Sequence, residues 1–151
     1  MSKSLHTLVK GLIIAGMLFG VALLVLVFMK VLPITARFFY AEGRPKAFAW
    51  AAGALAVLFV LGGEYIAWVL LGMMRTLDED PFVERNVKAL RNMGIAAFAM
   101  MGMGLLTLLL HPVPLMVLAS LPVGMCGLFS LVLSGVFAKA VAYKQENDLT
   151  V

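Results

Sequence analysis

The sequence has little of what a disulfide-bonded or water-soluble protein needs. It contains a single cysteine, Cys126, so no intramolecular disulfide can form. Only 13% of the 151 residues are charged, whereas about a quarter are charged in a typical soluble domain. Hydrophobic residues make up 63% of the chain. A surface facing water could not accommodate so many apolar side chains, which indicates an integral membrane protein.

Charge is also missing from long stretches. Residues 11–29, 93–110 and 113–138 carry none, and Glu64 is the only charged residue in 47–74. A membrane-spanning helix needs about 20 apolar residues, and no alternating pattern suggests a β-barrel. The first stretch is longer than the core of a signal peptide, so we expect it to be retained. We predict one all-α integral membrane domain over residues 1–151, a four-helix transmembrane bundle with helices near 8–32, 46–76, 81–110 and 114–144.

The distribution of Lys and Arg predicts the orientation. With four spans, both termini and the middle loop lie on one side of the membrane. That side would hold eight basic residues, against four in the outer segment between Lys30 and Lys46. The excess favours cytoplasmic termini and a cytoplasmic middle loop. The outer segment also contains aromatic residues, which we interpret as an interfacial belt in preference to an external sensor surface.

The stretch DEDPFVERNVKALRNMG, residues 78–94, concentrates charge in the predicted middle loop. Asp80 followed by Pro81 is typical of a helix start, and Glu84 with Lys88 forms a favourable i,i+4 pair. Val83, Val87, Leu90 and Gly94 share one helix face. We expect the third and fourth helices to extend side by side into the cytoplasm. There the charged residues either anchor the helix ends at the interface or bind a soluble partner.

Two stretches carry a resemblance to a known family. The motif Pro81-Phe82…Asn86…Leu90-Arg91…Gly94 and the ending Glu146-Asn-Asp-Leu-Thr-Val151 resemble those of an uncharacterised bacterial four-span membrane family, the domain of unknown function numbered 2975. The resemblance implies four spans, a bacterial inner membrane and frequent gene neighbourhood with a small helix-turn-helix regulator. It implies no established activity.

Glu64 is the ionisable residue expected near the middle of the bilayer. An unpaired charge there would cost several kcal/mol, so the side chain should be neutral, paired or beside water. Tyr65, and Ser130 at a similar depth in the fourth helix, are the hydrogen-bonding groups that we expect nearby. A structural hydrogen bond and a proton- or ligand-sensing site are both open interpretations.

Signatures of enzymes and of metal sites are absent from the sequence. It has no phosphate-binding loop, zinc-protease motif or nucleophile elbow, so we expect no enzyme and no cofactor. Met100, Met101 and Met103, with Cys126 and His111, are soft ligands that suit Cu(I). Methionine equally fills irregular gaps in helix packing, so we predict no metal site. No basic surface interleaved with aromatics indicates direct nucleic-acid binding, and nothing predicts the oligomeric state.

Two functional hypotheses remain. In the first, a regulatory or anchoring membrane protein holds a cytoplasmic protein, such as a small helix-turn-helix regulator. In the second, a small transporter or sensor uses Glu64. The predicted docking surface of the first hypothesis consists of two groups of residues: Asp80, Phe82, Arg85, Asn86, Lys88, Leu90 and Arg91, and the tail Asn147, Asp148, Leu149, Thr150 and Val151. If extended, the tail would direct Leu149 and Val151 to one side.

Overall fold

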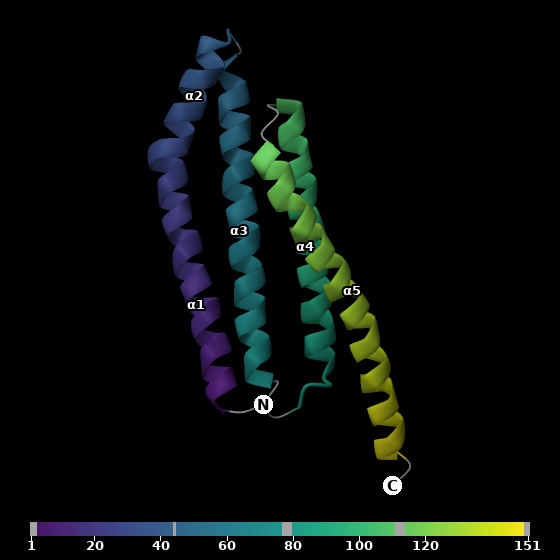
Figure 1. Cartoon of the computed structure of the whole chain (residues 1–151). Coiled ribbons are helices and arrows are strands. Elements are labelled where there is room, and N and C mark those ends of the chain that lie inside the picture. Colours follow the sequence, from purple (N-terminus) through teal and green to yellow (C-terminus); the bar gives the residue numbers. More distant parts are fainter. Residues whose placement is uncertain (1–2, 44, 77–79, 111–113, 150–151) are drawn as a thin grey trace.

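All of the regular structure in the described residues is helical. The computed structural model describes residues 3–43, 45–76, 80–110 and 114–149. Its elements are α1 (Lys3–Leu26), the π-helical turn η1 (Val27–Val31), α2 (Leu32–Ala41), α3 (Lys46–Thr76), α4 (Glu84–Leu110) and α5 (Pro114–Leu149). Figure 1 shows the long helices running up and down in alternation, so that both termini lie at one end of the molecule. We call this end the termini side and the opposite end the far side.

The first helix is longer than predicted and contains a π-helical turn. The prediction ended it at residue 32, but α1, η1 and α2 run without a break from Lys3 to Ala41. Pro33 has no N–H to donate and its ring crowds the carbonyl four residues earlier, which disturbs the α-helical bonding. The backbone hydrogen bonds change from α-helical to π-helical spacing just before Pro33, where Leu32 N–H donates to Val27 O, five residues back. The predicted outer loop is therefore helical over most of its length.

The boundaries of the other three helices agree with the predicted ones to different degrees. The prediction of residues 46–76 for the second span is confirmed by α3. The third helix was predicted to begin at Pro81, but α4 begins at Glu84. The fourth was predicted to end at residue 144, and α5 continues to Leu149. An extended tail is therefore wrong as far as Leu149, whereas Thr150 and Val151 lie outside the described residues.

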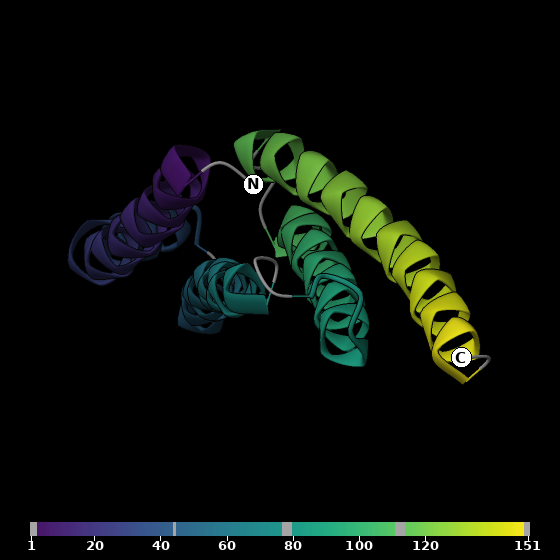
Figure 2. The same cartoon turned by 90° about the horizontal axis from the view of Figure 1, so that it is seen from below.

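The helices form an open row instead of closing around a common core. Each long helix packs on its neighbour in the chain: α1 on α3, α3 on α4, and α4 on α5. Among the described residues, no Cα of α5 comes within 8 Å of α1 or α3. Figure 2, an end-on view, shows the resulting arc with α1 and α5 at its two ends. The predicted four helices are present, but their arrangement is more open than the predicted bundle.

The most extensive helix contact joins α4 and α5 and has two glycines at its centre. A Cβ on Gly94 would lie 3.0 Å from Gly127 O and 2.6 Å from Leu131 Cγ. Ser134 Oγ donates to Val87 O at 3.0 Å across the same interface. Small residues at such positions let membrane helices approach closely. Nearer the termini side, a core of Met73, Leu90 and Met93 links α3 to α4, and Phe137 of α5 packs against it.

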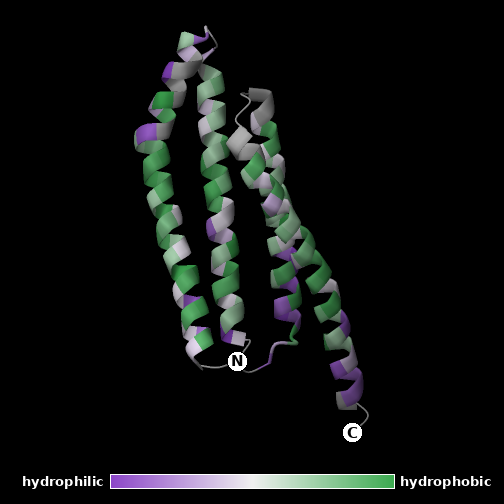
Figure 3. Cartoon of the chain, in the orientation of Figure 1, coloured by the Kyte–Doolittle hydropathy of each residue, from purple (hydrophilic) through white to green (hydrophobic). Residues whose placement is uncertain are grey.

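All four long helices are long and apolar enough to cross a membrane. Figure 3 shows apolar residues along the middle of the helices, whereas hydrophilic residues gather at the start of α4 and at the end of α5. The candidate spans include residues 4–34, 47–76, 84–107 and 118–147. At a rise of 1.5 Å per residue, the 36 residues of α5 extend about 54 Å, well beyond a hydrocarbon core of about 30 Å.

Candidate functional site

The connection between α3 and α4 is organised around Asn86, whose side chain is completely buried. Asn86 Nδ2 donates to Pro81 O at 2.9 Å, and Asn86 Oδ1 accepts from the Thr76 hydroxyl at 2.8 Å. In a helix beginning at Pro81, that carbonyl would instead accept from the N–H of Arg85. The Asn86 amide thus takes the place of a helical hydrogen bond, which explains why α4 begins only at Glu84.

Asp80 lies ahead of this turn and ties it to α5. Asp80 Oδ1 accepts a hydrogen bond from Phe82 N–H at 3.1 Å, the bond expected of a capping residue. Its Oδ2 forms an ion pair with Lys144 of α5. The rings of Phe82 and Phe137 pack with their centroids 5.3 Å apart. One polar and one aromatic contact therefore attach α5 to the α3–α4 connection.

The ion pair lowers the pKa of Asp80. The hydrogen bond from Lys144 is the largest cause; burial, the next largest effect, raises the pKa, and the hydrogen bond from Phe82 N–H again lowers it. Because the charged form is the one stabilised, Asp80 remains a carboxylate at neutral pH. The contact with Lys144 is therefore charge-assisted under those conditions.

A groove of about 330 Å³ lies between the start of α4 and the end of α5. Val87, Val141 and Ala142 provide apolar surface within it, and the Lys88 and Arg91 side chains add positive charge. The predicted Glu84–Lys88 pair is confirmed, with a nitrogen–oxygen distance of 4.0 Å between exposed side chains. The groove is lined by Glu84, Val87, Lys88, Arg91, Ala138, Val141, Ala142 and Gln145. We call it the α4–α5 groove.

The residues of the predicted docking surface do not all face this groove. Lys88 and Arg91 line it, whereas Arg85 lines a second hollow between α3 and α4. Asn86 and Leu90 are buried and so are corrected from surface residues to structural ones, because the turn and the core occupy their side chains. Phe82 packs on Phe137 while part of its surface stays exposed. Asn147, Asp148 and Leu149 belong to the last turns of α5, and Asn147 is exposed.

Glu64 faces α1 and not α5. It lines a hollow of about 350 Å³ between α1 and α3, and its carboxylate lies directly against Gly20. Tyr65 lines the hollow between α3 and α4 instead, and Ser130 belongs to α5, which does not approach α3. The predicted grouping of Glu64, Tyr65 and Ser130 is therefore wrong, because consecutive residues face different neighbours and the row of helices is open.

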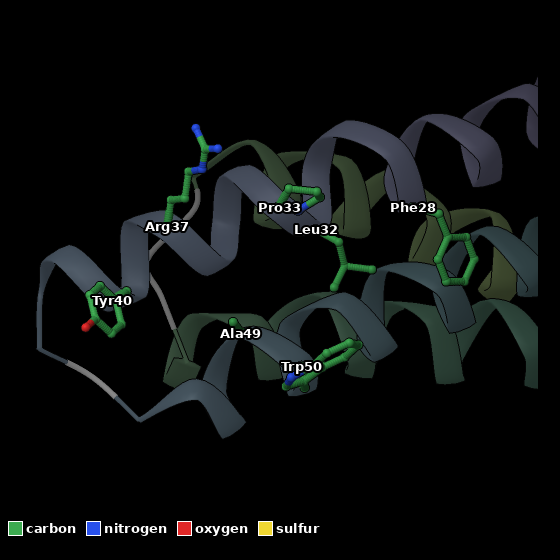
Figure 4. A pocket seen from close by; sticks show the side chains of 7 residues that line it. All are labelled: Phe28, Leu32, Pro33, Arg37, Tyr40, Ala49 and Trp50. Carbon is green, nitrogen blue, oxygen red and sulfur yellow. The ribbon is translucent and has the colours of Figure 1, made fainter.

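Sequence reasoning missed a hollow on the far side. Figure 4 shows this cavity of about 710 Å³ between α2 and the start of α3. Leu32 points across it and packs on Gly53 of α3, whereas the Arg37 guanidinium points away from Ala49 and Trp50. The remaining lining is apolar or aromatic: Phe28, Pro33 and Tyr40 complete it. Pro33, within a helical pattern, was the signal that could have revealed the π-helical turn beside this hollow.

The soft ligands considered for copper do not converge. Met100 packs on Gly62 of α3, whereas Met101 packs on Gly124 of α5. Met103 lies in a small hollow beside Leu55, and Cys126 is exposed on α5. His111 lies outside the described residues. Within the described ranges, no group of three His, Cys, Asp or Glu side chains could hold a metal ion.

Four helices of spanning length with an apolar middle define the class: this is a multi-pass α-helical membrane protein. The family model described as "Protein of unknown function (DUF2975)" matches residues 33–151, and the chain belongs to that family. The resemblance inferred from the Pro81–Gly94 motif is thereby confirmed. No curated protein and no solved structure matched the chain. The structure gives the motif a physical meaning, since Asn86 orders the turn, Phe82 contacts α5 and Gly94 permits the helix crossing.

Proposed function

We propose that this protein is a non-enzymatic membrane anchor that holds a soluble protein at the α4–α5 groove, on the predicted cytoplasmic side of a bacterial inner membrane. The observation that carries the proposal is the composition of the groove. Apolar surface from Val87 and Val141 lies next to Lys88 and Arg91, at the end of the molecule where hydrophilic residues gather. Helix grooves that bind amphipathic partner helices combine these two features.

The chemistry of the groove selects the kind of partner. An apolar floor with basic side chains suits an amphipathic helix that carries acidic residues beside its apolar ones. A small helix-turn-helix regulator, the partner implied by the family resemblance, is built mainly of helices and fits this requirement. The end of α5, which continues to Leu149, would lengthen the contact on one side of the groove.

Site-specific photo-crosslinking in intact membranes tests the proposal. A photoreactive side chain at Ala142, inside the groove, should capture a soluble protein, whereas the same group at the adjacent exposed Tyr143, which is not part of the groove lining, should not. Arg91→Glu should abolish the capture because the new carboxylate repels the acidic residues expected on the partner helix. The matched change Lys139→Glu, at an exposed position of α5 outside the groove lining, should leave capture intact. Equal capture from both positions, or capture unaffected by Arg91→Glu, would contradict the proposal.

A second candidate function rests on Glu64. Its carboxylate lines a largely apolar hollow between α1 and α3, where protonation or binding of a small cation would change its charge. This arrangement suits a proton or ligand sensor, or a small transporter. Glu64→Gln keeps the shape and removes the carboxyl group, so it should accumulate normally yet abolish a proton- or cation-dependent response. Under the anchoring hypothesis, Glu64→Gln should leave photo-crosslinking at Ala142 unchanged.

A further inference from the structure

The hollow between the end of α3 and the start of α4 is lined by three basic side chains. It measures about 360 Å³, and Arg75, Arg85 and Lys88 all contribute to its wall. Among the described residues that line it none is acidic, although Glu84 pairs with Lys88 from outside the wall. The remaining lining residues are Tyr65, Trp68, Val69, Leu71, Gly72, Met73, Asn86, Ala89 and Asn92. We call this hollow the α3–α4 groove.

The α3–α4 groove changes from apolar to cationic along its length. Trp68 lies seven residues before Arg75, which places it about 10 Å farther from the end of α3. Trp68 and Tyr65 are exposed and lie farther toward the middle of α3, where the acyl chains of a lipid would lie. Arg75 belongs to the last turn of α3, and Arg85 belongs to the first turn of α4. A ligand that matches both parts has an anionic end next to an apolar chain.

The chemistry of the cationic end favours a phosphate group. Two guanidinium groups can each donate paired hydrogen bonds to phosphate oxygens, and Lys88 adds a third positive charge. The Asn86 amide is already engaged by Pro81 O and Thr76, and Asn92 lies about 10 Å farther along α4, outside the cationic end. The start of α4 contributes the positive end of its helix dipole to the same region. Inorganic phosphate alone would leave the aromatic part of the groove without a contact.

We propose that the α3–α4 groove binds the phosphate headgroup of an anionic membrane lipid, with its acyl chains lying along Trp68 and Leu71. Basic pockets between membrane helices are suited to such headgroups. The site is separate from the α4–α5 groove in its decisive residues. Arg75, Arg85 and Trp68 line only the lipid site, and Arg91 lines only the proposed docking site, while Lys88 contributes to both.

Thermal unfolding of the purified full-length protein in mixed micelles tests the lipid site. Phosphatidylglycerol should raise the unfolding temperature more than phosphatidylcholine does, because only the former carries a net negative charge. The double substitution Arg75→Gln with Arg85→Gln should weaken the apparent affinity for phosphatidylglycerol at least tenfold. Both side chains are exposed, so the fold should tolerate the change. Arg37→Gln, at the exposed far-side position, is the matched control and should bind phosphatidylglycerol as the unmodified protein does.

Two further measurements test whether the phosphate belongs to a lipid and whether the arginines bind it by paired hydrogen bonds. Inorganic phosphate alone should give no comparable stabilisation, and an equal effect would overturn the assignment to a lipid. Arg75→Lys keeps the charge but loses the paired hydrogen bonds, so its affinity should fall between those of the unmodified protein and the double variant. Equal responses to the two lipids, or an undiminished response of the double variant, would also overturn the proposal. If the double variant still retains the soluble partner, the anchoring function stands whatever the result for the lipid site.

Discussion

Asn86 is the residue on which the turn between α3 and α4 depends most directly. Its buried amide satisfies Pro81 O and receives the Thr76 hydroxyl, two groups from opposite ends of the connection. No hydrophobic side chain of similar size could satisfy both. Its position in the family motif is therefore explained by structure, and a role in direct recognition is not needed to account for it.

Replacing Asn86 with Ala should destabilise the protein markedly. The change leaves Pro81 O without its donor, whereas the Thr76 hydroxyl can still donate to Met73 O. Leaving one such polar group unsatisfied costs about 1–3 kcal/mol. The unfolding temperature in detergent, followed by circular dichroism, measures the loss. Asn92→Ala is the control, because Asn92 is exposed on the same helix and its replacement should change stability by less than about 0.5 kcal/mol. Similar stability of the two variants would contradict the structural role of Asn86.

Replacing Gly94 with Ala should separate α4 from α5. The new methyl group would meet Leu131 and also the backbone oxygen of Gly127, which cannot move independently of its helix. Overpacking of this kind costs about 1–3 kcal/mol, which exceeds the gain of about 1 kcal/mol from removing a helix glycine. Gly102→Ala, on the same helix with open space at its Cβ position, should be neutral or stabilising. Comparison of the two unfolding temperatures checks the prediction, and a stabilising Gly94→Ala would sink it.

At the scale of the elements, the sequence predicted spans well and their ends less well. Uninterrupted apolar stretches located all four helices, because a bilayer demands length and low charge whatever the neighbours are. The start of α4 was missed because the buried Asn86 amide donates to the carbonyl of Pro81, five residues earlier. The capping pattern of Asp80 and Pro81 does not reveal this contact. The bend at η1 was missed because Pro33 was taken as part of a loop, although a π-helical turn accommodates it within a helix.

The candidate site was only partly predictable for a related reason. Spacing along one helix predicts that Val87 and Leu90 share a face, but it does not show what covers that face. Leu90, assigned to the docking surface, is buried in the core, whereas Val87 lines the α4–α5 groove. Which groove Lys88 or Arg85 would line depends on where α3 and α5 sit around α4. The pairing of Glu64 with Ser130 assumed a closed bundle, and only the relative placement of helices could reveal an open row.

The attachment of α5 to the α3–α4 connection should depend on pH. The pKa of Asp80 is lowered in the folded protein, so its stabilising contribution is fully present above the ordinary pKa of 3.8. The contribution is lost as the pH falls through the lowered pKa of the folded state. A double-mutant cycle of Asp80→Asn and Lys144→Gln should therefore show favourable coupling at pH 7 that disappears in strong acid and weakens in high salt. Coupling that persists after Asp80 is protonated would rule out the ion pair as its cause.

The whole molecule is an open arc, which gives the four helices unequal roles. α4 lies inside the row and contacts both α3 and α5, so it holds the most buried part of the structure. α1 and the outer face of α5 expose large apolar side chains, among them Leu18, Phe19, Phe129 and Val132. In a membrane, lipid chains can cover such faces without the penalty that water would impose. The polar grooves, by contrast, gather around α4 on the termini side.

The orientation of this arc decides whether those grooves face a soluble partner. Eight basic residues of the termini side, against four near α2, predict that both termini are cytoplasmic. A reporter that is active only in the cytoplasm should therefore work when fused after Val151 and fail when inserted at Glu42, in the turn between α2 and α3. A second reporter that requires export should give the opposite pattern at the two positions. If the C-terminal fusion reports an external location, the α4–α5 groove lies outside the cell, and a cytoplasmic regulator could not reach it.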